Sequence, residues 1–293
     1  AKTMKAKRAV LVIGGGIAGM QASLDLANRG LKVYLVEKTP SIGGRMAQLD
    51  KTFPTMDCSI CILAPKMIEC LRHPNIMLLT YSEIERVSGS AGKFRVKVRK
   101  KPRFIDESKC TGCGECSQYC PTEVPNEFDM NLGIRKAIYI PFPQAVPLKY
   151  TIDEENCIKC KLCQKICKAG AVDFDQKPET INLSVGAIIV ATGFELFDVG
   201  KINEYGYGRY RDILTSLEFE RLLSASGPTG GHLLKLSNGH IPKRIAFIQC
   251  VGSRSLKGGV HFCSSSCCVY ATKEAILVRE HHPECEVYIF YND

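Results

Sequence analysis

The chain has 293 residues, a length that allows about two domains. Hydrophobic residues make up 45% of it and charged residues 24%, which excludes a disordered chain and is typical of a globular protein with a buried core. No apolar run approaches the roughly 18 residues needed to span a bilayer. The formal net charge of +9 leaves a nucleic-acid partner open at this point.

The N-terminus shows no secretory signal. Lysines lead directly into a short apolar stretch and a glycine turn, without the longer apolar segment and cleavage site of a signal peptide. The sequence holds 16 cysteines, and without a signal they favour metal ligation in a reducing compartment over disulfides. We therefore expect a cytoplasmic location.

The first elements in chain order predict a nucleotide-binding unit. Residues 8–13 have the pattern of a buried parallel strand, residues 20–29 that of a helix, and residues 32–36 that of a second strand. The order strand, turn, helix, strand is that of a Rossmann-like fold.

The turn between the first strand and the helix carries a GxGxxG motif. Gly14 permits the tight turn, Gly16 lets the backbone approach a pyrophosphate, and Gly19 lets helix and strand pack closely. The helix N-terminus then presents free N–H groups to the phosphates. Glu37 ends the second strand at about the separation expected for an acidic residue that binds a ribose hydroxyl.

Two later segments favour FAD over NAD as the ligand. Residues 41–46, SIGGRM, follow the acidic residue, and residues 186–193, GAIIVATG, read as a buried strand ending in a turn of small residues. They resemble the GG and ATG motifs of FAD-dependent, two-dinucleotide-binding flavoproteins of the thioredoxin-reductase-like group. The residues that this resemblance places at the FAD site, or where the chain leaves the FAD domain, are Gly44, Arg45, Thr192 and Gly193.

Residues 97–103, KVRKKPR, are locally basic. The interpretation that we favour is a strand end exposed to solvent. The alternative is a docking patch for an acidic electron-carrier protein.

Eight cysteines form two runs with the same spacing, Cys-x2-Cys-x2-Cys-x3-Cys. This is the spacing of bacterial ferredoxins with two [4Fe-4S] clusters. Zinc is disfavoured because no histidine lies in the segment. Residues from about 104 to 177 are therefore predicted to form a ferredoxin-like insert that carries single electrons.

In such ferredoxins the fourth cysteine of each run ligates the other cluster. The rule gives the first cluster Cys110, Cys113, Cys116 and Cys167. It gives the second cluster Cys157, Cys160, Cys163 and Cys120.

Two features of the insert depart from the usual ferredoxin pattern. Lys168 follows the second run where proline is usual, and an ammonium group beside a cluster favours its reduced form. The gap of 36 residues between Cys120 and Cys157 is also unusually long, and it contains residues 140–147, IPFPQAVP, which are too rich in proline for a helix. We expect them to form an extended loop against the flavin domain or a partner.

A third set of cysteines lies in the C-terminal region. Residues 243–249 and 286–290 read as strands, and a helix that ends at residue 281 lies between them. The region has no GxGxxG motif, which argues against direct NAD(P)H binding. Cysteines lie in its turn and at its helix start, where a helix dipole stabilises thiolates. The set is Cys250, Cys263, Cys267 and Cys268.

Residues 38–50, residues 57–67, the insert and the C-terminal cysteine spacing together resemble the A subunit of heterodisulfide reductase. The resemblance covers nearly the whole chain. It implies that the C-terminal set holds a third [4Fe-4S] cluster near the flavin, with a redox disulfide or buried thiols as alternatives. It also adds Lys38 to the FAD site.

Four cysteines remain outside these sets. Cys58 and Cys61 are interpreted either as a dithiol facing the flavin or, as we favour, as two small side chains packed at the flavin edge. Cys70 and Cys285 are expected to be structural.

The predicted fold is α/β, a two-dinucleotide-binding, Rossmann-like flavoprotein with an inserted two-[4Fe-4S] ferredoxin domain. Three clusters and one FAD would lower the net charge to roughly +1, so we expect no nucleic-acid partner. The expected divisions are 1–103 for the first part of the FAD domain, 104–177 for the insert, 178–242 for the completion of the FAD domain with a linker, and 243–293 for a partial second Rossmann-like domain with a cysteine site.

The resemblance implies an oxidoreductase of methanogenesis: an electron-transfer, electron-bifurcating subunit in which FAD splits an electron pair between ferredoxin and a disulfide. The implied partners are other heterodisulfide reductase-type subunits, ferredoxin, and an electron-input subunit linked to a hydrogenase or formate dehydrogenase. No side chain is expected to act as an acid, base or nucleophile. The alternatives are a ferredoxin-linked NAD(P)H or quinone oxidoreductase subunit, and an electron relay without flavin.

Flavoproteins of this group are usually longer than this chain. They return to the FAD domain with a Gly-Asp motif, which this sequence lacks. We therefore expect a fragment, a shortened relative, or a split gene product completed by a second polypeptide.

Overall fold

The computed structural model describes residues 7–255 and 259–292. Residues 1–6, where a signal peptide would begin, lie outside this range. The chain divides into two compact units: one comprises the residues up to Ala47 together with Ile60–Gly193, and the other comprises Gln48–Ser59 and the residues from Phe194 onward. No helix within the described ranges is long and apolar enough to cross a membrane.

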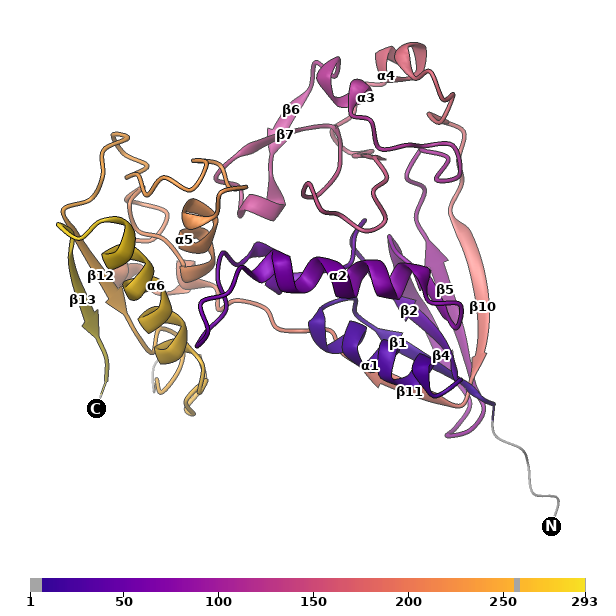
Figure 1. Ribbon diagram of the computed structural model, residues 1–293, viewed down its shortest axis with the longest axis horizontal. Helices are drawn as coiled ribbons and strands as arrows, with labels where there is room; N and C mark the ends of the chain where they lie inside the picture. Colours follow the sequence, from indigo (N-terminus) through magenta and orange to yellow (C-terminus); the bar gives the residue numbers. More distant parts are fainter. Residues whose placement is uncertain (1–6, 256–258, 293) are drawn as a thin grey trace. The chain divides into compact units, whose positions relative to one another are not determined.

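The first unit is built on a four-stranded parallel sheet in the order β11-β1-β2-β3 (Figure 1). Helices α1 and α2 pack on one face of this sheet. The expected strand at residues 32–36 is confirmed without change, whereas the expected helix begins three residues earlier, at Ile17. These elements are β1 (Ala9–Ile13), α1 (Ile17–Asn28), β2 (Lys32–Val36), α2 (Ser59–Arg72), β3 (Ile76–Leu79) and β11 (Ala187–Val190).

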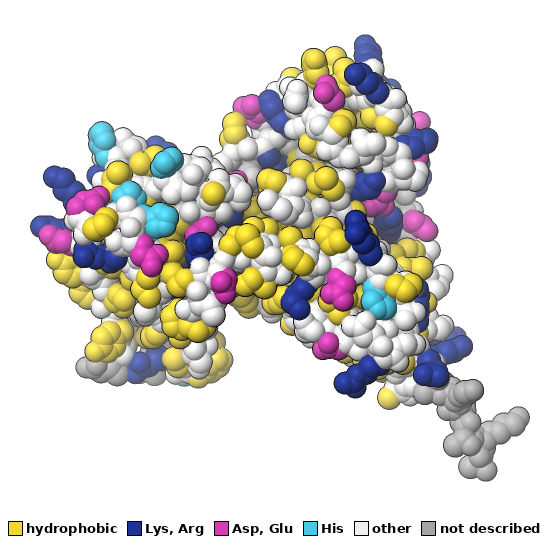
Figure 2. Space-filling view, viewed as in Figure 1, with side chains coloured by type: hydrophobic (Ala, Val, Ile, Leu, Met, Phe, Trp, Pro, Cys, Tyr) yellow, Lys and Arg dark blue, Asp and Glu magenta, His cyan; other side chains and the backbone are white. Residues whose placement is uncertain are grey.

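Helix α2 is apolar on more than its core-facing side. Leu63 and Met67 are buried in the same core as α1, whereas Ile62, Ile68 and Leu71 are each more than a third exposed. Figure 2 shows hydrophobic side chains gathered over this helix. Apolar side chains therefore surround much of its circumference.

A three-stranded antiparallel sheet, in the order β10-β5-β4, packs on the other face of the parallel sheet. Alternation along β1 shows why both faces are covered. Val10 and Val12 pack with the helices, whereas Leu11 packs with the antiparallel sheet. The antiparallel strands are β4 (Ser82–Ser88), β5 (Phe94–Lys100) and β10 (Glu179–Val185).

The ferredoxin-like insert follows β5 and ends before β10, between two strands of the antiparallel sheet. Its small core is shared by apolar side chains and by cysteines of both runs. Its elements are α3 (Glu115–Gln118), β6 (Glu123–Pro125), β7 (Ile134–Lys136), β8 (Ile138–Tyr139), β9 (Thr151–Ile152) and α4 (Leu162–Ile166).

The proline-rich loop at residues 140–147 packs against the flavin-type part of the first unit, which was the first of the two predicted alternatives. Phe142, Ala145 and Val146 are buried in the same core as α1 and α2. Insert and parallel sheet therefore share one hydrophobic core.

The second unit contains a parallel pair of strands joined by a helix, which confirms the expected strand, helix and strand near the C-terminus. A separate helix, α5, packs in the same core. The elements are α5 (Ser216–Leu223), β12 (Arg244–Ile248), α6 (Cys267–His281) and β13 (Glu286–Phe290). Short 3-10 helices across the chain cover Gly44–Gln48, Glu127–Asp129, Val199–Lys201 and Asn203–Tyr205.

Candidate cofactor sites

The glycine turn after β1 is shaped by two close contacts and one open space. A Cβ added at Gly14 would lie 2.3 Å from the Ala191 carbonyl oxygen, and one at Gly19 would lie 1.9 Å from the Gly14 carbonyl oxygen. A Cβ at Gly16 would meet no atom closer than 4.0 Å, where Gly44 Cα lies. The space in front of Gly16 is thus a cradle that a side chain would fill, and it fits a pyrophosphate.

Helix α1 begins immediately after that cradle. Its N-cap residue, Gly16, makes no side-chain capping hydrogen bond. The first backbone N–H groups of the helix are therefore available to a phosphate, and the positive end of the helix dipole points the same way.

Glu37 lies at the end of β2, beside the glycine turn. It is buried, and its Oε2 accepts a hydrogen bond from the Gly15 N–H at 2.7 Å while its Oε1 accepts one from the Thr39 N–H at 2.8 Å. These bonds hold the carboxylate next to the cradle. The position fits the role of an acidic residue that binds a ribose hydroxyl.

The other predicted FAD residues differ in exposure. Gly44 approaches Gly16 closely, because a Cβ at Gly44 would lie 2.9 Å from Gly16 Cα. Arg45 is half-buried, with its Nη1 3.9 Å from the Met130 sulfur. Lys38 and Gly193 are exposed, and Thr192 is exposed as well.

Four cysteines from both ferredoxin runs line one small pocket in the insert, which is closed by apolar side chains such as Ile138 and Ile152. Burial, followed by neighbouring thiolates, raises the pKa of the Cys163 thiol to about 11. The four are Cys120, Cys157, Cys160 and Cys163.

The other four insert cysteines gather around Cys116. Burial, followed by neighbouring cysteine thiolates, raises the pKa of its thiol to about 12. Cys120 therefore lies beside the three leading cysteines of the second run, and Cys167 lies close enough to Cys116 to affect its charge. The thiolates acting on Cys116 are those of Cys110, Cys163, Cys113 and Cys167.

The two runs share a local backbone geometry. The second residue after the first cysteine has a positive φ in both runs, 74° at Gly112 and 55° at Lys159. In the second run the Lys159 N–H donates to Cys157 Sγ at 3.4 Å. This turn points a backbone donor at a sulfur, as a thiolate ligand of an anionic cluster requires.

The C-terminal cysteines repeat that turn. Ser265 has a φ of 62°, and its N–H donates to Cys263 Sγ at 3.3 Å. Cys267 and Cys268 occupy the first turn of α6, as expected. The loop from Cys250 to Cys263 includes residues 256–258, which lie outside the described ranges.

The thiols of this set influence one another. Burial opposes ionisation of Cys267, but hydrogen bonds from the Ser264 side chain and from Cys250 and Cys268 outweigh it and lower the Cys267 pKa. The resulting negative charge raises the pKa of Cys268, to which Cys250 and Cys263 also contribute. The pKa values of Cys267 and Cys268 therefore depend on the other cysteines of the set.

Within the described ranges, no three or more His, Cys, Asp or Glu side chains converge closely enough to hold a single metal ion. Cysteines bind iron as thiolates, so cluster loading must release protons from these thiols.

The remaining cysteines differ in state. Cys58 and Cys61 are both disulfide-bonded, so they are not the two packed thiols that we favoured. Cys70 and Cys285 are free and fully buried, as expected of structural residues. Burial raises the pKa of the Cys70 thiol to about 12, which makes it unreactive.

The basic stretch at residues 97–103 is not a uniform solvated strand end. Lys97 pairs with Glu85 at 2.8 Å, and Lys100 pairs with Glu107 at 2.6 Å. Arg103 is only 2% exposed, which contradicts both interpretations for that residue.

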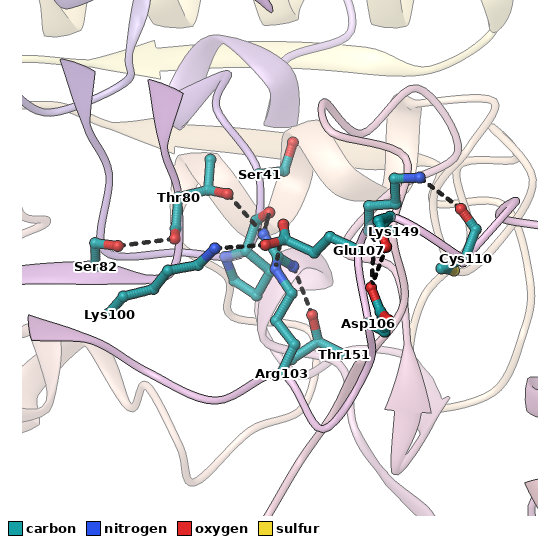
Figure 3. Close-up of polar contacts among 12 residues, drawn as sticks. Ser41, Thr80, Ser82, Lys100, Arg103, Asp106, Glu107, Cys110, Lys149 and Thr151 are labelled. Carbon is teal, nitrogen blue, oxygen red and sulfur yellow. Dashed lines mark hydrogen bonds and ion pairs between the residues drawn. The ribbon is translucent and has the colours of Figure 1, made fainter. Parts of the chain in front are cut away.

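The sequence analysis did not identify Arg103 as a buried residue that contacts several segments. Figure 3 shows its guanidinium among groups from several segments of the first unit. Proline precedes it and the insert begins after it, and neither feature signals burial. Only the position at a domain junction could have drawn attention to it.

Comparison with protein families supports both kinds of site. Residues 9–124 match the family model of FAD dependent oxidoreductases, and residues 150–173 match that of 4Fe-4S binding domains. The fold and these matches define the class: a protein of the FAD-dependent oxidoreductase type that also carries a 4Fe-4S binding domain.

The particular relatives extend along the whole chain. The iron-sulfur A subunit of CoB–CoM heterodisulfide reductase from Methanocaldococcus jannaschii is 58% identical over 292 residues, which is 100% of this chain and 44% of that protein. The second of two such A subunits from Methanopyrus kandleri is 60% identical over 97% of this chain and 43% of its own length. The A subunit from Methanosarcina acetivorans, whose reductase is named as ferredoxin/F420H2-dependent, is 51% identical over 100% of this chain and 37% of its own.

These identities confirm the resemblance over the whole chain, which therefore belongs to the family of heterodisulfide reductase A subunits. The chain spans less than half the length of those relatives. Among solved structures, L-proline dehydrogenase from P. horikoshii aligns with 97% of this chain and 35% of its own, at 13% identity and a TM-score of 0.40.

Proposed function

We propose that this chain is the flavin and iron–sulfur electron-transfer part of a cytoplasmic, electron-bifurcating heterodisulfide reductase-type complex. Its partners would be the other subunits of that complex, ferredoxin, and an input subunit linked to a hydrogenase or formate dehydrogenase. A second polypeptide or segment would complete the flavoprotein. The identity to relatives of the A-subunit type along the whole chain supports this proposal.

One observation carries the proposal: the insert with eight cysteines is seated on the loop that carries the GG motif. The Ile42 N–H donates to the Val146 carbonyl oxygen at 3.0 Å, and these residues form an antiparallel bridge. Both segments belong to one compact unit. Such a contact would hold the insert at a fixed position relative to a bound flavin.

We assign the ligands as the sequence predicted them. The cradle at Gly14, Gly16 and Gly19 would hold the FAD pyrophosphate, and Glu37 the ribose, with Lys38, Gly44, Arg45, Thr192 and Gly193 around them. The ferredoxin runs would hold two clusters in the crossed pairing, and the C-terminal set a third. When bound, FAD exchanges electron pairs and the clusters exchange single electrons; the protein holds them in place.

Anaerobic purification followed by flavin and iron analysis tests the cofactor assignment. We expect one FAD and about twelve iron atoms per chain, four for each cluster. About eight iron atoms without flavin would instead indicate an electron relay. The Cys250→Ser variant is the matched comparison, since it should lose the iron of one cluster and keep the flavin.

Bifurcation needs a separate measurement. In the assembled complex, electrons from a two-electron donor should reach a ferredoxin and a heterodisulfide in equal amounts. When either acceptor is omitted, the other should not be reduced. Reduction of ferredoxin alone at full rate would contradict bifurcation while leaving the electron-transfer role intact.

A further inference from the structure

We infer that Arg103 is a positioning residue that fixes the loop of the first ferredoxin cluster relative to the FAD-binding loop. The inference rests on the proposed transfer of electrons between these two sites. It names a residue that sets the geometry for that transfer, one that touches neither the flavin cradle nor a cysteine thiol in the described contacts.

On one side, Arg103 contacts the flavin-type fold. Its Nη2 donates to the Pro40 carbonyl oxygen at 2.6 Å and to Thr80 Oγ1 at 2.7 Å (Figure 3). Pro40 directly precedes the GG-motif segment at residues 41–46, and Thr80 directly follows β3. Arg103 Nη2 therefore bonds to two segments that follow the carboxyl ends of parallel strands. Folds of this kind bind nucleotides at that edge of the sheet.

On the other side, Arg103 contacts the insert. Its Nη1 donates to Thr151 Oγ1 at 2.7 Å, and its Nε lies 3.1 Å from Glu107 Oε1 in an ion pair. Glu107 is three residues before Cys110, the first cysteine of the first run. The side chains of Arg103 and Glu107 therefore connect the segment after β2 to the backbone that leads to that cysteine.

The shape of the guanidinium suits this role. Its planar fork directs separate nitrogens at acceptors on both sides, whereas a lysine ammonium is a single point of charge. The Arg103 side chain is 1% exposed, so its geometry is set by packing as well as by these bonds. Burial lowers its pKa, and Glu107 opposes that shift.

Loss of Arg103 should loosen the junction without unfolding the insert. Val146 and Phe142 anchor the insert to the core at a second place. Glu107 would also keep a cationic partner, because Lys100 lies 2.6 Å from its Oε2. A substitution at Arg103 therefore leaves no unpaired buried carboxylate that would confuse the result.

The test compares Arg103→Met and Arg103→Lys with Arg99→Met, a control at an exposed position on β5. In the anaerobically purified protein we would measure flavin and iron content, cluster midpoint potentials, and the rate at which a rapidly reduced flavin reduces the clusters. Hydrogen exchange at residues 104–110 would report the order of the loop.

We expect both Arg103 variants to keep their cofactors and potentials, to exchange amide hydrogens faster at residues 104–110, and to transfer electrons several-fold more slowly. The transfer rate of Arg103→Lys should fall as far as that of Arg103→Met, because both variants lose the planar set of hydrogen bonds and the lysine restores only the positive charge. Thr151→Val and Thr80→Val, which remove one bond on each side, should give smaller losses in the same direction.

An unchanged transfer rate in Arg103→Met with full cofactor content would overturn the inference. So would full rescue by lysine, because that would reduce the role of Arg103 to its charge. If the parent protein itself passed no electrons from flavin to clusters, the proposed function would fail, and that result is distinguishable because it needs no variant.

Discussion

The Val146 N–H donates a hydrogen bond to Ser41 Oγ at 2.8 Å, across 105 residues of sequence. Ser41 begins the GG-motif segment, and Val146 lies in the proline-rich loop of the insert. Both residues are buried. This bond therefore joins the GG-motif segment to the insert that carries the two cysteine runs.

Ser41→Ala should weaken that junction. The Val146 N–H would lose its partner in a buried place, which costs about 1–3 kcal/mol. The free energy of unfolding and the hydrogen exchange of the Val146 amide measure the loss. Ser184→Ala, at an exposed position on β10, should change neither quantity. Slow exchange at Val146 in the Ser41 variant would contradict the importance of this bond.

Gly16→Ala and Gly19→Ala should fail in different ways. A Cβ at Gly16 enters open space, so the variant should fold normally and lose FAD, because the methyl group fills the cradle. A Cβ at Gly19 would lie 1.9 Å from the Gly14 carbonyl oxygen, so that variant should lose stability itself. Flavin titration combined with thermal unfolding separates the two. Tight FAD binding by Gly16→Ala would show that the pyrophosphate lies elsewhere.

The crossed pairing of the ferredoxin cysteines predicts which variants share a phenotype. Cys120→Ser should remove the same electron paramagnetic resonance signal as Cys163→Ser, whereas Cys167→Ser should remove the other signal. Each should lose up to about four iron atoms. Cys70→Ala is the control and should keep all of the iron. Loss of the same signal in Cys120→Ser and Cys116→Ser would instead mean that each run binds its own cluster.

Lys168→Gln should lower the potential of the cluster that we propose Cys167 to ligate. Lys168 is exposed and follows that cysteine, so its charge favours the reduced form. The expected shift is about 10–40 mV, equivalent to the roughly 0.2–1 kcal/mol of an exposed charge pair. Redox titration measures it, with exposed Lys177→Gln as the control. Lys168→Pro, which restores the usual ferredoxin residue, should act in the same direction, and two unmoved potentials in that variant would rule out the charge effect.

A buried carboxyl in the second unit predicts a pH dependence of stability. Glu274 on α6 is fully buried, and neither of its carboxyl oxygens has a hydrogen-bond partner among the described residues. Burial, and then the Glu220 carboxylate, hold its pKa well above the ordinary value, although Lys273 opposes them. Glu220 and Lys273 themselves form a buried ion pair.

The sign follows from the raised pKa. The folded state keeps the proton that the unfolded state releases, so stability is full below the ordinary glutamate pKa and falls as pH rises toward the folded value. The fall is at most about 1.4 kcal/mol per pH unit for one group. Glu274→Gln should flatten this slope when unfolding is measured at increasing pH above the ordinary glutamate pKa. Exposed Glu280→Gln, on the same helix, should leave the slope as it is.

The cysteine spacing and the glycine motif predicted most of the candidate sites, because the residues of each motif lie close together in the sequence. A tight turn such as that at Gly14, or a Cys-x2-Cys-x2-Cys run, encodes its own backbone geometry within a few residues. The strands and helices next to them were predicted for the same reason. The match to FAD-dependent oxidoreductases and to [4Fe-4S] domains confirms the cofactor classes that these motifs indicated.

The sequence by itself determined which chemical groups this protein can hold, since each motif carries its ligands at fixed spacing. Only the tertiary structure decided how those sites are joined. The burial of Arg103, its contacts with Pro40 and Thr151, and the bond between Ser41 and Val146 link segments far apart in the chain. Such contacts arise from packing around a shared core, and no periodicity or spacing records them.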